Sequence, residues 1–147
     1  MIMDRTALFS DRQPITADAA STNIVDLGAT GTVYGASAPI LRDIGYGHGI
    51  PLVMTVTQSF NNLTSMQIRV ETDDNSGFAS AKVVFLSPVY TLAQLQTGAE
   101  YLLPDAIPGG TNERYVRIFY DITGTAPTLG QVTAGVAMDR QSRGIYN

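Results

Sequence analysis

The chain has 147 residues, of which 44% are hydrophobic and 15% are charged, and it carries a net charge of −4 and no cysteine. This length fits a single domain covering residues 1–147, and the lack of cysteine excludes both a disulfide-stapled scaffold and thiolate metal sites. Lys82 is the only lysine beside eight arginines, so the sequence disfavours nucleic acid and anionic membrane surfaces as partners.

The first residues bear on where the chain is made. Residues 1–3 lead directly into Asp4 and Arg5, which leaves no apolar stretch long enough for a signal peptide. No apolar run approaches the roughly 20 residues that a membrane-spanning helix needs. We therefore expect synthesis and folding in a host cytoplasm. Short apolar segments at residues 6–9 and 23–27 predict the first strands.

Residues 28–50 form a long segment rich in Gly, Ala, Ser and Pro, without hydrophobic periodicity. Loops without secondary structure rarely exceed about 12–15 residues, so we expect this one to be functional or mobile. It contains His48, the only histidine of the chain, between two glycines. With a single histidine, a Ser-His-Asp triad would have only one candidate base, and a metal site with two histidine ligands cannot form. We therefore expect no enzymatic activity, no catalytic residue, no metal and no cofactor.

Two alternating segments follow. In residues 66–71 the apolar side chains of Met66, Ile68 and Val70 share one face, and residues 52–57 repeat the pattern. Polar residues between the two segments favour a turn, so we predict that they pair as a hairpin.

The next segment combines a turn with an apolar run. Asp73, Asp74 and Asn75 resemble a fragment of a calcium-binding loop, but Gly77 occupies the place of a third oxygen ligand, and a turn explains these residues better. The continuous apolar run in residues 82–86 predicts a strand covered on both faces.

The last third of the chain contains two further alternating segments. In residues 113–122 apolar side chains alternate with Tyr115, Arg117 and Phe119, so both faces of this strand are expected to be covered. Residues 131–138 predict the last strand. About eight short strands separated by Gly, Pro, Asn and Asp, with little helical signal, indicate an all-β antiparallel sandwich or barrel.

A polar tail, residues 139–147, follows the last strand and contains Arg140, Arg143 and Tyr146. Arginine and tyrosine are the residue types that dominate binding hot spots. The tail could therefore anchor the chain on a neighbouring subunit, or it could be a frayed terminus.

The charged fraction of the chain is also low, well below the roughly 25% of average soluble proteins. Two interpretations are open: the surface is covered by a partner, or the chain is an ordinary Thr-rich β-protein.

Several short segments of the sequence resemble the capsid cement, or decoration, proteins of short-tailed bacteriophages, the family of the Bordetella phage cement protein. These segments are residues 8–13, 15–16, 19–23 and 26–28, with further matches at 42–45, 71–73 and 132–135. The similarity is strongest over the first quarter of the chain and includes no catalytic signature. Arg12 lies in the best-matching segments, so it is a further candidate contact to the capsid, in addition to Arg140, Arg143 and Tyr146.

The resemblance implies a jelly-roll β-sandwich that forms a homodimer on the outer surface of the virion, at or near two-fold axes. Its partner would be the major capsid protein, without a small-molecule substrate. A symmetric dimer that grips two capsid subunits gains avidity, which can reach about 10²–10⁴ without any new contact. Two alternatives remain: a carbohydrate-binding or adhesin-like sandwich that uses tyrosine-bearing loops, and a small β-barrel enzyme that depends on His48.

Overall fold

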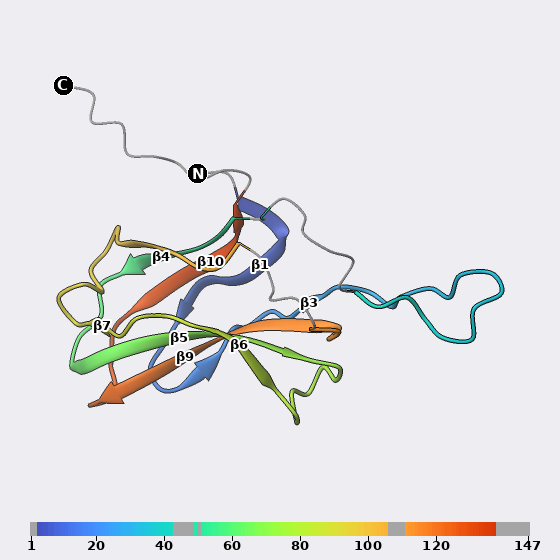
Figure 1. Ribbon diagram of the computed structural model, residues 1–147. Coiled ribbons are helices and arrows are strands. Elements are labelled where there is room, and N and C mark those ends of the chain that lie inside the picture. The colour runs from blue at the N-terminus through green and yellow to red at the C-terminus, as the bar shows by residue number, and fades with distance from the viewer. Residues whose placement is uncertain (1–2, 43–48, 50, 106–110, 138–147) are drawn as a thin grey trace, which may run out of the picture.

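We analysed a computed structural model that describes residues 3–42, 49, 51–105 and 111–137. Within these ranges the chain forms β-strands and loops and no helix (Figure 1). The strands are β1 (Met3–Pro14), β2 (Ala19–Ala20), β3 (Val25–Asp26), β4 (Leu52–Gln58), β5 (Leu63–Asp73), β6 (Lys82–Leu86), β7 (Tyr90–Thr91), β8 (Glu100–Leu102), β9 (Tyr115–Gly124) and β10 (Gln131–Ala137). The described part of the chain therefore has no helix with the length and hydropathy needed to cross a bilayer.

The strands form two antiparallel sheets. One sheet has the order β1-β10-β4-β8, and the other has the order β2-β9-β5-β6, with β3 also paired to β9 and β7 also paired to β5. When β2 with β3, and β6 with β7, are each counted as one interrupted strand, eight strands run in the orders 1-8-3-6 and 2-7-4-5. This is the strand order of a jelly roll. The predicted all-β, jelly-roll-like sandwich is confirmed.

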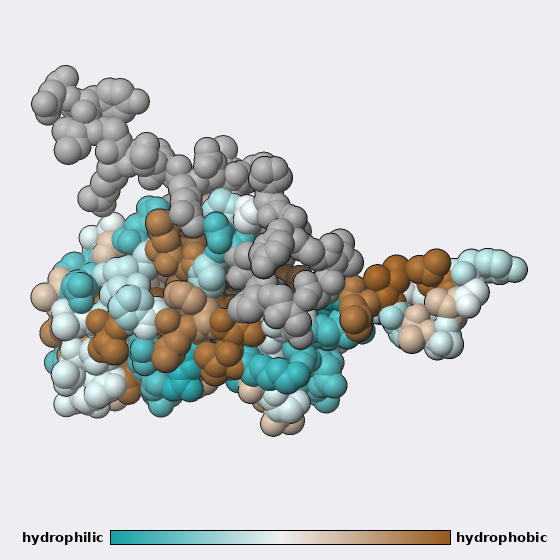
Figure 2. All heavy atoms as spheres, viewed as in Figure 1, coloured by the Kyte–Doolittle hydropathy of each residue, from teal (hydrophilic) through white to brown (hydrophobic). Residues whose placement is uncertain are grey.

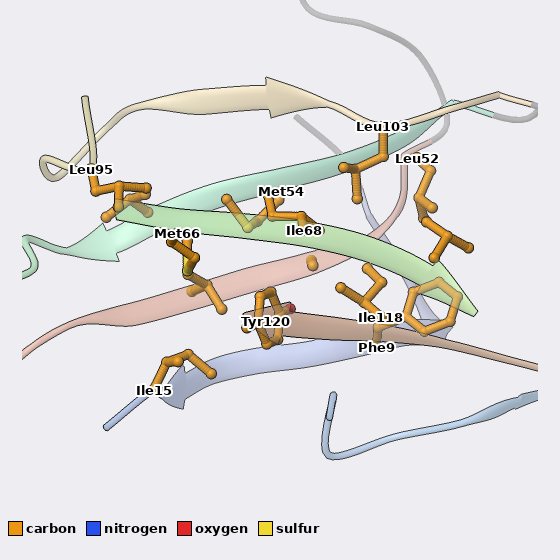
Figure 3. Packing of buried hydrophobic residues seen from close by; sticks show 14 of the residues in the cluster. Phe9, Ile15, Leu52, Met54, Met66, Ile68, Leu95, Leu103, Ile118 and Tyr120 are labelled. Carbon is orange, nitrogen blue, oxygen red and sulfur yellow. The ribbon is translucent and has the colours of Figure 1, made fainter. Parts of the chain in front are cut away.

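The core lies between the sheets, where both sheets direct their apolar side chains (Figure 3). Met66, Ile68 and Val70 of β5 are buried, as their alternation predicted. On β9 the hydroxyl of Tyr120 lies 2.8 Å from the Ser10 hydroxyl of β1, in the other sheet, and both side chains are buried. The long register between β5 and β9, which runs from Leu63↔Gly124 to Asp73↔Tyr115, forms the centre of one layer.

Two local predictions were wrong. β4 and β5 do not form a hairpin, because β4 pairs with β10 and β8 in one sheet whereas β5 pairs with β9 and β6 in the other. Their apolar faces meet across the core, so the same alternation arises without pairing. The strand at residues 82–86 is also not covered on both faces. It lies at a sheet edge, where Val83 and Leu86 remain about half exposed.

Candidate interaction surfaces

Residues 27–42, here called the arm, leave the end of β3 and extend away from both sheets (Figure 1). Of the long segment predicted at residues 28–50, the structure describes residues 28–42, which belong to the arm, and Gly49. Every residue from 31 to 41 is exposed. The arm therefore adds almost nothing to the core and presents its side chains to the surroundings.

The tip of the arm is a tight turn. The Ala36 amide donates a hydrogen bond of 2.9 Å to the Val33 carbonyl, which closes a turn with Tyr34 and Gly35 at its centre. Gly35 has a φ of 81°, and this left-handed backbone is the one that the third position of a type II turn requires. Further down, the Ile40 amide donates to the Gly31 carbonyl at 2.9 Å and holds the two legs together.

The base of the arm is fixed to the sandwich by two arginines. Arg114 donates two hydrogen bonds of 2.7 Å to the two carboxylate oxygens of Asp26, the last residue of β3. Arg42 donates from its guanidinium to the carbonyls of Leu27 and Gly28, and its amide donates to the Asn112 side chain at 2.9 Å. These contacts join both legs to each other and to the segment before β9.

The ion pair at the base persists in acid. Hydrogen bonds from Arg114 and from the Gly28 amide lower the pKa of Asp26 to about 2, whereas Asp ordinarily titrates near 4. Asp26 therefore stays ionised, and the pair stays formed, throughout the neutral and mildly acidic range.

The arm combines exposed apolar side chains with a lack of charge from Leu27 to Leu41. No charged residue occurs between Asp26 and Arg42. The ring of Tyr34 is fully exposed, and Val33, Ile40 and Leu41 are each about half exposed or more. A shallow hollow on the arm is lined by Leu27, Ala29, Thr30, Gly31, Ile40, Leu41 and Arg42. Such a set of unburied apolar side chains on one projecting element makes the arm a candidate interaction surface.

A second group of exposed apolar side chains, here called the β6–β8 side, lies along or beside the edge strands β6, β7 and β8 of the sandwich. It contains Val83, Leu86, Val89 and Leu102, each about half exposed. The rings of Tyr90 and Tyr101 pack together, 4.1 Å between centroids, and so bring the β7 and β8 edges of the two sheets to this side. Figure 2 shows apolar atoms gathered over the sandwich body as well as on the arm.

Most described arginines are used within the chain. Arg69 pairs with Asp121, and Arg117 pairs with Glu71 at 2.8 Å while lying over the Phe78 ring at 4.2 Å. Arg42 and Arg114 fix the arm. Among the described residues, these four arginines therefore hold the fold together rather than a partner.

Arg12, predicted as a capsid contact, differs from these four. It lies in an irregular stretch of the β1–β10 pairing and has a φ of 45°, and its amide donates to the Thr133 hydroxyl at 3.0 Å. Its guanidinium forms no ion pair or hydrogen bond with any described residue. A bulge that turns an unpaired arginine outward is compatible with a contact role. The structure does not bring Arg12 to the arm.

The group of acids at Asp73, Asp74 and Glu113 has its oxygen atoms within 4.8 Å of one another. Asp73 accepts hydrogen bonds from the amides of Asn75 and Ser80, at 2.9 and 2.8 Å, and these lower its pKa to about 2. The pKa of Asp74 is raised by the hydrogen bond between its side chain and Asp73. Glu113 is paired with Lys82. The hydrogen bonds of Asp73 are those of a turn, as predicted, and no cation is required to explain the group.

The remaining predicted contacts, Arg140, Arg143 and Tyr146, lie outside the described residues, as does His48. Sequence reasoning missed the arm residues Val33, Tyr34, Ile40 and Leu41 as candidates. Their signal was present as apolar residues within a stretch that has neither periodicity nor charge.

Comparison with known proteins adds a family. The profile of the Bbp16 family matches residues 9–136, which include both sheets, the arm and Arg12. No curated protein matches the sequence. The predicted resemblance to a Bordetella phage family is thereby confirmed, and the chain belongs to the Bbp16 family.

Proposed function

We propose that this protein is a capsid decoration protein: a non-enzymatic homodimer that binds the outer surface of a phage capsid and clamps neighbouring major capsid proteins. Membership of a phage protein family supports a virion role. The observation that carries the proposal is the presence of two separate groups of exposed apolar side chains, on the arm and on the β6–β8 side. A dimeric clamp needs two surfaces, because one must pair with a second copy and the other must grip the shell.

The β6–β8 side suits contact with a second copy. A two-fold contact uses the same patch on both subunits, so the patch must be complementary to itself. Apolar side chains suit such a patch, since apolar contacts carry no sign of charge. Lys82, at one end of β6, is already paired with Glu113 and adds no unbalanced charge.

Two measurements test the proposal. Analytical ultracentrifugation of the purified protein should give a dimer, and the protein should co-sediment with expanded shells that have been stripped of decoration. A monomer, or protein left in the supernatant at micromolar concentration, would contradict the proposal.

The tail provides a separate prediction. Replacing Arg140 and Arg143 together by alanine removes two bidentate donors, and we expect weaker shell binding with an unchanged melting temperature. Unchanged occupancy of the shell by this variant would rule out the tail as an anchor.

The carbohydrate-binding alternative has less support. Among the described tyrosines only Tyr34 has a fully exposed ring, and Tyr90 and Tyr101 pack on each other. A sugar-binding platform uses aromatic faces that are open to a ligand. A glycan array with a clear signal that Tyr34→Ser abolishes would revive this function.

A further inference from the structure

We infer that the arm inserts into an uncharged, apolar recess of the capsid protein, with Val33 and Tyr34 at its tip as the anchor. This inference rests on the proposed function and names the partner surface of the arm. It follows from four features of the arm: the lack of charge from Leu27 to Leu41, the fixed base, the exposed side chains at the tip, and the projection from the sandwich.

The lack of charge specifies the chemistry of the recess. Placing a neutral arm against charged groups would strip those groups of water without supplying a partner, which costs free energy. An apolar lining avoids this cost, and burial of the arm then gains free energy in proportion to the apolar area removed from water. Such binding should respond weakly to salt, because salt screens only interactions between charges.

The fixed base makes the arm effective as a binding element. Arg42 and Arg114 hold both legs, the Ile40 amide bonds across to Gly31, and the Gly35 turn sets the tip. An element already ordered in its binding shape loses little conformational entropy on binding. Tyrosine at the end of such an element is the type of residue found at hot spots.

The shape of the arm favours the shell over a second copy. A two-fold contact through the arm would require each copy to offer a recess to the arm of the other copy. The hollow seen on the arm is shallow and is lined by residues of the arm itself. The β6–β8 side is available for self-contact and lies at the opposite edge of the six-stranded sheet from β3, where the arm begins. The two surfaces can therefore bind two different partners at once.

The test compares a tip variant with a matched control in co-sedimentation with stripped, expanded shells. The variant is Val33→Ser with Tyr34→Ser, which removes apolar groups without changing charge. The control is Leu129→Ser, which removes a side chain of comparable exposure in the loop between β9 and β10, at the other end of β9. Circular dichroism melts and analytical ultracentrifugation of each protein report folding and self-association.

We expect the tip variant to need at least about tenfold more protein for half-occupancy, and the control to stay within about twofold of the unsubstituted protein. The ratio of half-occupancy concentrations between the tip variant and the unsubstituted protein should change less than about threefold between about 0.1 M and about 0.5 M NaCl, because the tail arginines contribute equally to both proteins.

Each other outcome overturns a specific statement. If the unsubstituted protein binds and the tip variant binds equally well, the arm is not the anchor, although the decoration function stands. If that ratio changes steeply with salt, the recess is not uncharged. If the tip variant becomes monomeric, the arm binds a second copy instead. If the unsubstituted protein itself does not bind, the proposed function fails first.

Discussion

The sandwich and the arm use the same residue types in opposite ways. Ile68, Gly130 and Tyr120 lie within the packed sandwich, whereas Ile40, Gly35 and Tyr34 lie on the arm, without a packed environment. In the sandwich these residues determine stability, and on the arm they are available to a partner. Substitutions at matched pairs should therefore separate folding from binding within one small protein.

The isoleucine pair should give the largest difference. Ile68 is fully buried between the sheets, so Ile68→Ala should lower the free energy of unfolding by about 2–5 kcal/mol through lost burial and a cavity. Ile40 is about half exposed on the arm, and Ile40→Ala should change the same quantity by less than about 0.5 kcal/mol. Urea denaturation measures both. Equal losses would mean that the arm is part of the cooperative fold.

The glycine pair comes next. Gly130 has a φ of 137°, and an added Cβ would overlap the Phe60 ring. Gly130→Ala should cost about 2–4 kcal/mol, because backbone strain and overpacking each cost about 1–3 kcal/mol. Gly35 also has a positive φ but has open space around it, so Gly35→Ala should cost only the backbone strain, about 1–2 kcal/mol, while weakening shell binding. A stable Gly130→Ala variant would show that the loop before β10 is looser than described.

The tyrosine pair should differ mainly in alkali. Burial raises the pKa of Tyr120, whereas in the unfolded chain this tyrosine ionises near pH 10. The contribution of neutral Tyr120 to stability is thus complete below about pH 10 and is lost as the pH rises further. Tyr120→Phe should lower the free energy of unfolding by about 1 kcal/mol at pH 7, the value of one hydrogen bond. Above about pH 10, the free energy of unfolding of this variant should fall less steeply with pH than that of the unsubstituted protein.

Tyr34→Phe is the control for this experiment. The Tyr34 ring is fully exposed, so urea denaturation between pH 7 and pH 11 should follow the unsubstituted protein. An unchanged alkaline slope in Tyr120→Phe would mean that another group causes the loss.

The acid response of the arm base should be the smallest effect. The low pKa of Asp26, about 2, means that its pairing contributes above the unfolded value near 4 and is lost as the pH falls through about 2. Asp26→Asn should therefore accelerate hydrogen exchange of the Gly28 amide, which donates to Asp26 at 2.8 Å, and leave global stability nearly unchanged. Glu71→Gln, which alters the Arg117 pair on the sandwich, should not affect that amide.

The sequence predicted much of the sandwich. Alternation correctly placed the buried faces of β5 and β9, and the start of β10 at Gln131 was correct, whereas the second face of β9, with Tyr115, Arg117 and Phe119, is only half-buried. Alternation determines which side chains face the core, but it does not choose the neighbouring strand. That is why β4 and β5 were wrongly paired, and why the edge position of β6 was missed.

The candidate surfaces were harder to predict. Composition indicated a weakly charged chain, but the form of the arm depends on contacts between distant residues, such as Arg42 with Asn112 and Asp26 with Arg114. Nothing local to residues 27–42 specifies these partners. Arginine and tyrosine content directed attention to the tail, while four of the described arginines proved to be structural.

The most direct test of the account is a cryo-electron microscopy reconstruction of shells decorated with the purified protein. We predict dimers on the outer surface, each with residues 27–42 of both subunits buried against the capsid protein and with the β6–β8 sides facing each other. Shells without bound protein, or bound protein whose arms point into solvent, would contradict it.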